Sequence, residues 1–260
     1  MRLVKRNLIQ EGDYMKINIH AGHNPDGRIA CGAVGLIKES TEARKVKNEV
    51  IRLLRNSGHT VYDCTVDNGT SQNDVLSTIV DKCNNHEVDL DISIHFNSGR
   101  NDKKGDDATG GTEIYVYSKS SKAKSAAEKI CKAIAALGYK NRGVKTSTSL
   151  YVIKHTNSPS MLIECCFVDD KDDVEIYNHK TMAEAIVRGI TGKNPTSKSY
   201  KVKVSSQTLN VRMGPGSKYP IHGKVKRNEV YTIVDTENNW GKLKSGAGWI
   251  SLKYTEKVKG

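Results

Sequence analysis

The sequence predicts an α/β fold, with a mostly parallel sheet flanked by helices, followed by a small all-β barrel. From Lys16 to about Gly192, apolar strand segments alternate with amphipathic helix patterns, and this alternation is typical of a sheet covered by helices on both faces. Beyond this region the periodicity changes to short strands separated by turns. A length of 260 residues and a hydrophobic content of 37% are sufficient for one α/β domain and a small second domain.

The α/β region is expected to begin with a strand at 16–21, where apolar and polar residues alternate. A helix over 41–57 should follow, because its apolar residues share one stripe and Gly58 suits a C-terminal cap. The same patterns predict the next three elements, which are a strand at 60–64, a helix at 73–85 and a strand that begins near Asp91 and ends at His95.

The alternation continues to the end of this region. Segments 98–110 and 138–145 are expected to be a polar loop and a connector. The remaining predicted elements are strands at 111–117, 150–153 and 160–164 and helices at about 121–137 and 178–191. Short strands are then expected at 200–204, 208–212, 222–226, 229–235, 239–243 and 247–251, which together predict a small barrel.

These patterns define the expected domains. Residues 15–192 form the α/β domain, the polar, proline-containing segment 193–199 is the linker, and 200–260 form the all-β domain. The first 14 residues show no periodicity, and no role is assigned to them. The N-terminus contains no continuous apolar stretch of the kind found in signal peptides, and the chain contains no run of 18 apolar residues. Synthesis in the cytoplasm without membrane insertion is therefore expected.

The net charge of +12 is unevenly distributed. Residues 200–260 contain 12 Lys or Arg against 4 Asp or Glu, a net charge of +8. Such asymmetry indicates a polyanionic partner, which could be nucleic acid, anionic lipid or a phosphate-bearing wall polymer, and a merely solvated surface is the alternative. Nucleic acid is not expected, because the sequence shows no helix-turn-helix, zinc-finger or aromatic stacking signature.

The six cysteines include no CxxC pair, which predicts reduced thiols rather than a disulfide framework. Cys165 and Cys166 are adjacent, and adjacent strand residues point to opposite faces, so we do not expect them to ligate the same metal. We expect both to be small buried apolar residues.

Polar residues follow or end three of the predicted strands. His23 follows the first strand, with Gly22 expected to make the turn that presents it, and His95 and Glu164 lie near the ends of two others. Because ligands of α/β proteins bind in the crevice at the carboxyl ends of parallel strands, these side chains are expected to converge.

His23, Glu39 and His95 are the candidate ligands of one zinc ion. Catalytic zinc commonly takes three ligands from His, Glu or Asp and leaves its fourth position to water, whose pKa then falls toward neutrality. Glu39 lies in the loop after His23, just ahead of the predicted helix, and Glu42 inside that helix is its rival. Glu164 would stay unliganded and act as the general acid–base. No HExxH motif is present, and the ring of His20 is expected to lie on the sheet face as a structural group.

Several segments, together with Glu39, resemble the zinc-dependent N-acetylmuramoyl-L-alanine amidases of the amidase-3 type over residues 15–192. They are HAGHN (20–24), SIHFN (93–97), GGTEIYV (110–116) and LIECCFVD (162–169). The resemblance implies a six-stranded mixed sheet, one zinc ion held by His23, Glu39 and His95, and Glu164 as the catalytic residue. The implied reaction is cleavage of the amide bond between the lactyl group of muramic acid and L-alanine of the stem peptide.

One departure from the family pattern is visible. The first motif more commonly reads GHG or GHGG, whereas Asn24 and Pro25 follow His23 here, which leaves the shape of the loop from 24 to 38 open. Arg142, Lys145 and Tyr151 precede the Glu164 strand and are candidate substrate-binding residues, although ordinary surface charge explains them almost as well.

The C-terminal segments TLNVRMGPGSKYP (208–220) and NWGKLKSGAGWI (239–250) resemble the bacterial SH3-like wall-binding domain. GPG makes a tight turn, and the lysines add attraction to anionic wall polymers. Tyr219 and Trp249 are the candidate wall-binding residues, although the aromatic residues that contact a ligand cannot be separated by sequence from those that fill the barrel.

A catalytic amidase domain followed by a wall-binding domain predicts a peptidoglycan hydrolase with the layout of a phage endolysin, released from the cytoplasm to act at the cell wall. A host autolysin or a spore-lytic amidase is the alternative enzyme, and a wall-binding protein on an inactive amidase scaffold is the alternative without catalysis. The expected partners are peptidoglycan and anionic wall polymers, and the sequence leaves the oligomeric state open.

Overall fold

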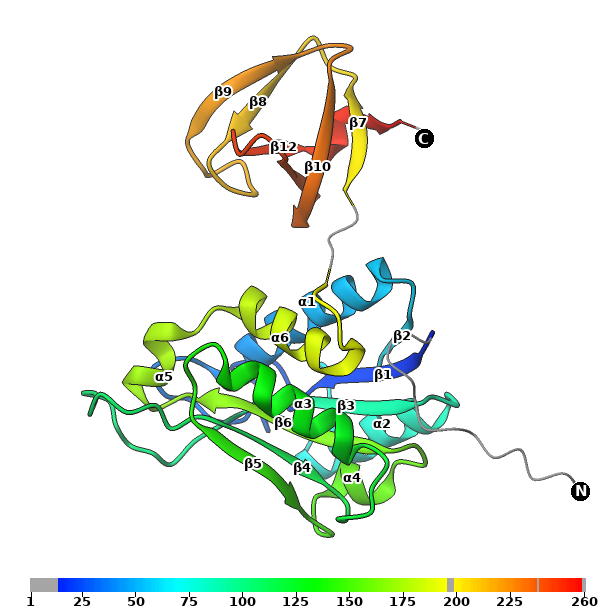
Figure 1. Ribbon diagram of the computed structural model, residues 1–260, viewed down its shortest axis with the longest axis vertical. Coiled ribbons are helices and arrows are strands. Elements are labelled where there is room, and N and C mark those ends of the chain that lie inside the picture. The colour runs from blue at the N-terminus through cyan, green and yellow to red at the C-terminus, as the bar shows by residue number, and fades with distance from the viewer. Residues whose placement is uncertain (1–13, 196–198, 238, 259–260) are drawn as a thin grey trace, which may run out of the picture. The chain divides into compact units, whose positions relative to one another are not determined.

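The computed structural model of the chain describes residues 14–195, 199–237 and 239–258 (Figure 1). Most of the N-terminal segment 1–14, and residues 196–198 of the expected linker, lie outside the described residues. The chain divides into two compact units, Met1–Pro195 and Thr196–Gly260.

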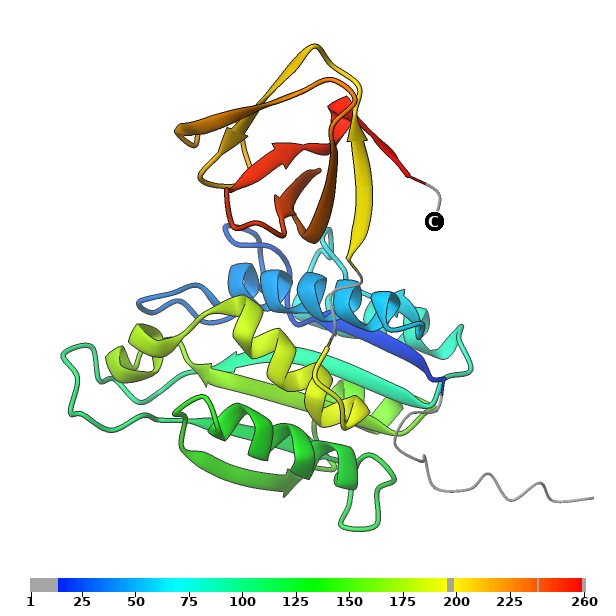
Figure 2. The same ribbon diagram turned by 45° about the horizontal axis from the view of Figure 1, so that its top comes forward.

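The first unit contains a six-stranded sheet with the order β2-β1-β3-β6-β4-β5 (Figures 1 and 2). Neighbouring strands run parallel except for β4 and β6, which are antiparallel. The predicted mixed, mostly parallel sheet is therefore confirmed. The strands are β1 (Lys16–Ala21), β2 (Thr60–Asp63), β3 (Leu90–Asn97), β4 (Thr112–Val116), β5 (Asn141–Thr146) and β6 (Ser160–Phe167).

Helices cover both faces of this sheet. One core joins the sheet to α1 (Glu39–Asn56), α3 (Lys124–Ala135) and α6 (His179–Thr191), which lie side by side (Figure 2). A smaller core on the other side contains residues of α2 (Gln72–Asn84) and α4 (Tyr151–His155). The short helix α5 (Lys171–Ile176) follows β6.

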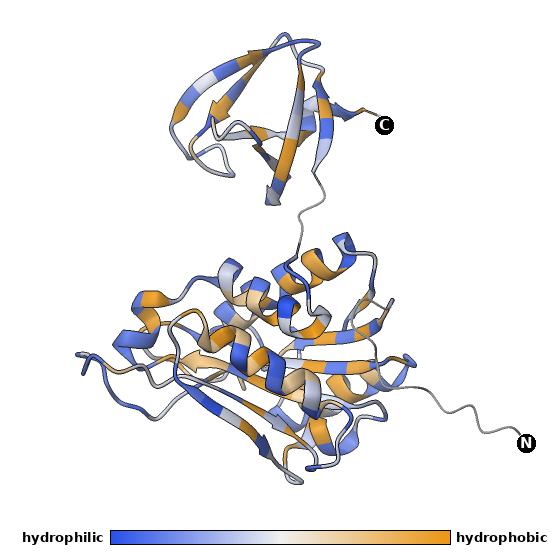
Figure 3. Cartoon of the chain, viewed as in Figure 1, coloured by the Kyte–Doolittle hydropathy of each residue, from blue (hydrophilic) through white to orange (hydrophobic). Residues whose placement is uncertain are grey.

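The two faces of the central strands differ in polarity. In β1 and β3, alternate residues such as Ile17, Ile19 and Ile92 are fully buried beneath α1, α3 and α6. The intervening positions carry polar side chains that are also almost completely buried, such as His20 and Ser93. Orange and blue residues accordingly alternate along these strands (Figure 3). Because side chains in a strand alternate with period two, His95 and Glu164 extend the polar face to the carboxyl ends of β3 and β6.

Two predictions for the first unit were wrong. The expected connector 138–145 contains the edge strand β5, whose half-exposed sequence NRGVKT lacks the apolar alternation that reveals a strand. The expected strand at 150–153 forms the helix α4. Its apolar run resembles a strand, but the Ser147 hydroxyl accepts the backbone N–H groups of Ser149 and Leu150, and such a turn favours the start of a helix over an extended strand.

Cys165 and Cys166 are both fully buried in the same core, which confirms their prediction as small apolar residues. The register between β3 and β6 shifts after His95, since His95 pairs with Glu164 but Asn97 pairs with Phe167. This bulge explains how two adjacent residues of one strand are buried together. All six cysteines are free thiols.

The second unit is a seven-stranded antiparallel sheet with the order β13-β7-β10-β11-β12-β8-β9. Its core contains Val202, Val211, Ile233 and Ile250, each at most 3% exposed. The strands are β7 (Tyr200–Val204), β8 (Thr208–Arg212), β9 (Ile221–Lys226), β10 (Val230–Glu237), β11 (Trp240–Leu243), β12 (Trp249–Ser251) and β13 (Thr255–Lys257). Only β13 and the short 3-10 helix η1 (Leu252–Tyr254) were not predicted.

Across the described residues, no helix combines the length and the apolar character needed to cross a membrane.

Candidate active site

His23 directly follows the end of β1 and has a left-handed backbone conformation, with φ of 67°. Gly22 does not supply this turn, contrary to the prediction. Its lack of a side chain instead leaves space for the ring of His95. A Cβ atom at Gly22 would lie 2.0 Å from Cε1 of His95. The His23 and His95 rings meet edge to face, with their centroids 4.9 Å apart.

Glu39 is the first residue of α1 and is 4% exposed. Its Oε1 lies 3.0 Å from Nδ1 of His95 and 3.3 Å from Nε2 of His23. Oε2 accepts a hydrogen bond from the backbone N–H of Ala33 (2.8 Å). Burial alone would raise its pKa, but the hydrogen bonds to His23 and His95 hold the pKa of Glu39 well below its usual range. The carboxylate is therefore ionised at neutral pH, as a metal ligand must be.

The side chains of His23, Glu39 and His95 each offer one ligand atom, and these atoms all lie within 4.8 Å of one another. Two imidazole nitrogens and one carboxylate oxygen are a donor set found in catalytic zinc sites. The space around them is kept open by the absence of side chains, since a Cβ at Gly32 would lie 2.6 Å from Oε2 of Glu39. By donor type and spacing, the three residues fit one zinc ion.

Glu164 lies beside this group, because it pairs with His95 in the register of β3 and β6. Its Oε2 is buried and has no hydrogen-bond partner. Burial raises the pKa of Glu164 to about 8, and the negative charges of Glu39 and Glu113 contribute in the same direction. An orphaned carboxylate oxygen with a raised pKa, next to a metal-ligand set, has the properties of a general acid–base.

Glu113 is a buried carboxylate that sequence reasoning did not single out, although it lies in the GGTEIYV segment. It is 2% exposed and pairs with Glu164 in the antiparallel register of β4 and β6. Its Oε1 accepts hydrogen bonds from Asn97 Nδ2 (3.1 Å) and Tyr115 OH (2.9 Å). Its Oε2 accepts from the candidate substrate-binding residues Arg142 and Lys145.

Two other residues shape the loop after His23: Asn24, whose role the sequence left open, and Arg44, which sequence reasoning missed. The side chain of Asn24 is completely buried and bonds to the carbonyls of Ile29 (2.9 Å) and Gly69 (2.7 Å) and to the N–H of Gly69 (3.0 Å). Arg44, on α1, donates to the carbonyl of His23 (2.9 Å). The departure from the family pattern at Asn24 thus fixes the start of the loop 24–38.

The structure does not bring the remaining candidates into this group. Glu42, the rival ligand, bonds to Lys45 and to the hydroxyl of Tyr177. Tyr151 lies on α4, between the end of β5 and the start of β6, which is the edge of the sheet opposite to the carboxyl end of β6. His20 is buried on the sheet face, with Nδ1 3.5 Å from the Ser93 hydroxyl.

A second acidic group, formed by Asp102, Asp170 and Asp172, also places ligand atoms within 4.8 Å of one another. Asp170 is occupied by structural contacts, because it accepts from Arg100 Nε (2.9 Å) and caps α5 by accepting the N–H of Asp173. We therefore assign this group to the attachment of the loop 98–110.

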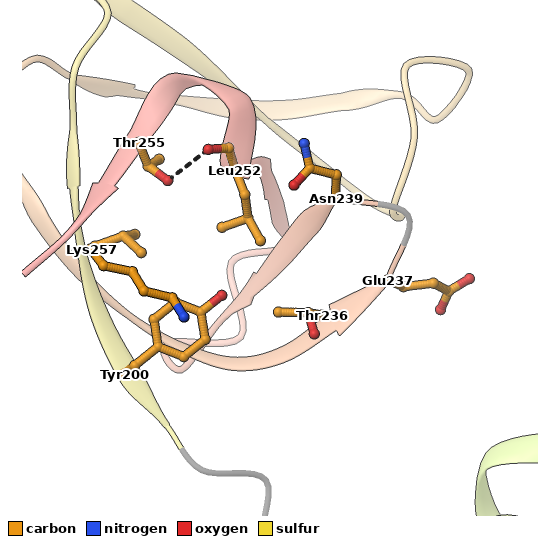
Figure 4. Close-up of a pocket in the computed structure, with 8 residues that line it drawn as sticks. Tyr200, Thr236, Glu237, Asn239, Leu252, Thr255 and Lys257 are labelled. Atoms are coloured by element: carbon orange, nitrogen blue, oxygen red, sulfur yellow. Dashed lines mark hydrogen bonds between the residues drawn. The ribbon is translucent and has the colours of Figure 1, made fainter. Parts of the chain in front are cut away.

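In the second unit, Trp249 is 7% exposed and Tyr219 is 36% exposed. Their wall-binding roles remain predictions, and the burial of Trp249 leaves little of its ring at the surface. A cavity of about 460 Å³ lies elsewhere in this unit and is lined by Tyr200, Glu237, Asn239 and Lys257 among others (Figure 4). The Lys257 amine lies 4.7 Å from the centre of the Tyr200 ring.

The mixed sheet and its site define the class of protein, a hydrolase with a candidate metal-binding group at the carboxyl ends of the strands. Residues 17–192 match the N-acetylmuramoyl-L-alanine amidase family, and residues 207–256 match the bacterial SH3 domain. The chain belongs to the N-acetylmuramoyl-L-alanine amidase family. It is a peptidoglycan amidase with an added bacterial SH3 domain.

Several individual proteins are similar to this chain. An uncharacterized 38.4 kDa protein of Clostridium perfringens is 34% identical over 246 residues, which are 85% of this chain and 69% of the relative. The endolysin of Bacillus phage SPP1 is 28% identical over 265 residues, covering 88% of this chain and 92% of the endolysin. The catalytic domain of CD27L endolysin targeting Clostridia Difficile superposes with a TM-score of 0.62 at 28% identity, over 70% of this chain and 99% of that domain.

Proposed function

We propose that the first unit is a zinc-dependent N-acetylmuramoyl-L-alanine amidase, in which His23, Glu39 and His95 hold one zinc ion. The observation that carries this proposal is the convergence of these three donors beside the unpartnered carboxylate oxygen of Glu164. When bound, zinc would supply Lewis-acid polarisation of the scissile carbonyl.

Glu164 would move the proton. During hydrolysis a water oxygen bonds to the carbonyl carbon, the C–N bond breaks, and the amine of L-alanine gains a proton. The buried Glu164 accepts the proton of the attacking water on its free oxygen and returns it to the leaving nitrogen. Its pKa of about 8 is close to neutrality, which suits a group that must both accept and donate.

Glu164→Gln tests this assignment, because the amide keeps the shape of the side chain but cannot accept and return the proton. We expect zinc content to stay near that of the wild type and the release of L-alanine amino termini from purified peptidoglycan to fall at least about 100-fold. A chelator should abolish the activity of the wild type, and added zinc should restore it. Near-native activity of the variant would assign the proton transfer to another group, and full activity without metal would exclude zinc.

The second unit is proposed to bind the cell wall. The net charge of +8 over residues 200–260 favours anionic wall polymers, and the match of residues 207–256 to the bacterial SH3 domain supports a targeting role. The cavity at Tyr200 combines one aromatic ring, a lysine, a carboxylate and an amide, which are the groups that fix a polar ligand in a concave site. We propose this cavity as the ligand site, in preference to Trp249.

The whole chain is proposed to be an endolysin, made in the cytoplasm and acting at the wall after release. The phage SPP1 endolysin favours this role over a host autolysin, because its similarity to this chain extends across nearly its full length. Bacteria that produce the protein internally should remain intact until their membrane is permeabilised and should then lyse. Lysis before permeabilisation would contradict this proposal and favour an exported autolysin.

A further inference from the structure

The candidate active site continues into a group of positive charges. Glu113 lies beside Glu164 in the sheet, and its Oε2 accepts from Arg142 Nε (2.6 Å) and Lys145 Nζ. One carboxylate neutralises only one of these two cations, so this group of three residues keeps a net positive charge. Among the described residues, no ion pair joins either cation to Glu164.

Both cations are fixed in position but remain accessible. The Arg142 guanidinium lies 5.1 Å from the centre of the Phe167 ring, and Lys145 Nζ lies 5.7 Å from the centre of the Tyr115 ring. Contacts with an aromatic face and with a buried carboxylate restrain the two head groups. The side chains of Arg142 and Lys145 are nevertheless 30% and 40% exposed, so a ligand can reach them from solvent.

The spacing matches that of a stem peptide. Neighbouring strands lie about 4.8 Å apart, and Glu113 on β4 is one strand from Glu164 on β6 and two strands from His95 on β3. The cations at Glu113 are therefore roughly 10 Å from the metal-ligand group. An extended peptide spans about 3.3–3.6 Å per residue, so a carboxylate on the second stem residue lies roughly 7–10 Å from the scissile carbonyl.

We propose that Arg142 and Lys145, held by Glu113, form a subsite for a free carboxylate on the second residue of the stem peptide. The inference rests on the proposed amidase function, and it adds a specificity for stems in which this group is a carboxylate and not a carboxamide. A carboxylate accepts charge-assisted hydrogen bonds from both cations, whereas a neutral amide forms weaker ones. We expect a preference of roughly 10- to 100-fold in kcat/KM.

Two soluble muramyl peptides that differ only at this group, carboxylate or carboxamide, test the subsite with the full chain loaded with zinc. The wild type should prefer the carboxylate substrate. Arg142→Gln and Lys145→Met should each lose kcat/KM on the carboxylate substrate, chiefly through KM, and lose less on the carboxamide, so that the preference between the two substrates shrinks. Lys140→Met removes a neighbouring exposed cation that has no contact with Glu113, and it should keep the full preference.

Equal rates of the wild type on the two substrates would overturn the subsite, as would variants that retain the preference. Helical circular dichroism identifies a variant that fails to fold. If one of the two variants fails to fold, the substrate preference of the other variant tests the subsite. If the zinc-loaded wild type hydrolyses neither substrate and releases no L-alanine amino termini from peptidoglycan, the proposed amidase function itself fails, an outcome distinct from activity without preference.

Discussion

The turn after β1 and the space beside it depend on two residues, His23 and Gly22. The sequence pattern had predicted that Gly22 alone makes this turn. The positive φ falls on His23, and a non-glycine residue in this region stores strain of about 1–3 kcal/mol. Gly22 has no positive φ, but its missing side chain makes room for the His95 ring. The candidate ligand His23 is thus held in a strained backbone conformation, and the ring of the candidate ligand His95 fills the space that Gly22 leaves.

Gly22→Ala should therefore displace His95 and weaken metal binding. A Cβ at this position would lie within 2.6 Å of three atoms of the His95 ring, so the ring must move, and we expect zinc affinity to fall roughly 10- to 100-fold. Titration with a zinc indicator measures this directly. Gly223→Ala in β9 is the matched control, because its Cβ would meet no atom within 4 Å. A Gly22→Ala protein with wild-type zinc affinity would show that this contact does not position His95.

His20 belongs to the same HAGHN segment as His23 but has no ligand role. It is 1% exposed and its Nε2 has no hydrogen-bond partner. Burial, together with the electrostatic interaction with His95, lowers the pKa of His20 to about 3. The folded protein therefore keeps this ring neutral, whereas the unfolded chain protonates it below about pH 6.5.

This difference predicts a stability that falls in acid. Between about pH 6.5 and 3 the unfolded state binds the additional proton, so the free energy of unfolding decreases as the pH falls, by about 1.4 kcal/mol per unit. His20→Leu should remove this part of the pH dependence, which amounts to about 2–3 kcal/mol between pH 6.5 and 4.5. Urea unfolding in the presence of a chelator, followed by helical circular dichroism, measures it. His155→Leu, at an exposed position, is the control. If the free energy of unfolding of His20→Leu depends on pH as steeply as that of the wild type, His20 is not held neutral by burial.

The choice between Glu39 and Glu42 shows where residue-level prediction from sequence reaches its limit. The strand patterns were sufficient to predict that His23, His95 and Glu164 share one edge of the sheet. Helix boundaries are uncertain by a few residues, and α1 begins at Glu39 and not at about Thr41. Only the contacts of Glu39 with both histidines, and of Glu42 with Lys45 and Tyr177, separate the two glutamates.

At the scale of elements, buried strands and amphipathic helices were predictable, and edge elements were not. β1, β3 and β6 carry apolar residues that the core requires, so their patterns are strong. β5 has one half-exposed apolar residue, Val144, and is defined by its pairing with β4. Such pairing is a tertiary property that local sequence does not encode. Glu113 was missed for the same reason, since its importance depends on its neighbours in β6 and β5.

The loop between β1 and α1 is an element whose shape depends on one side chain. Asn24→Ala would remove three hydrogen bonds and leave the part-buried N–H of Gly69 and two carbonyls without this partner. We expect the free energy of unfolding to fall by about 2–4 kcal/mol. Asn24→Gly, which restores the residue more common in the family, should be similarly destabilising because it loses the same bonds.

Urea unfolding followed by helical circular dichroism is the measurement, since the described α-helices all lie in the first unit. Asn48→Ala, at an exposed position of α1, is the control and should be neutral or slightly stabilising. Equal stability of Asn24→Ala and the wild type would show that the loop does not require this side chain.

At the scale of the whole molecule, the two units differ in charge and have separate cores. The core of the second unit is made of its own residues, and residues 200–260 contribute +8 of the net charge of +12. The catalytic candidates all belong to the first unit. Residue counts along the sequence reveal the uneven charge directly, whereas the catalytic candidates were predicted from motifs at the ends of strands.

Deletion of residues 196–260 should therefore separate wall binding from chemistry. The truncated chain keeps the whole metal-ligand group and its own core, so its kcat/KM on a soluble muramyl peptide should be unchanged. Its cosedimentation with purified walls should fall strongly, because the basic unit is gone. Binding of the full chain should weaken as salt is added, since salt screens the attraction between lysines and anionic polymers.

Two tyrosine variants of the full chain then distinguish the ligand site from general charge attraction. Tyr200→Ala removes the aromatic wall of the cavity against which Lys257 lies, and it should weaken wall binding even at a salt concentration that screens the charges. Tyr219→Ala tests the residue predicted from sequence and should bind like the wild type if the cavity is the site. Because both tryptophans lie in the second unit, tryptophan fluorescence reports whether either variant perturbs its fold.

Weaker binding by Tyr219→Ala alone would assign ligand contact to the segment after β8 and reject the cavity. Equal binding by the truncated and full-length chains would reject the targeting role of the second unit altogether.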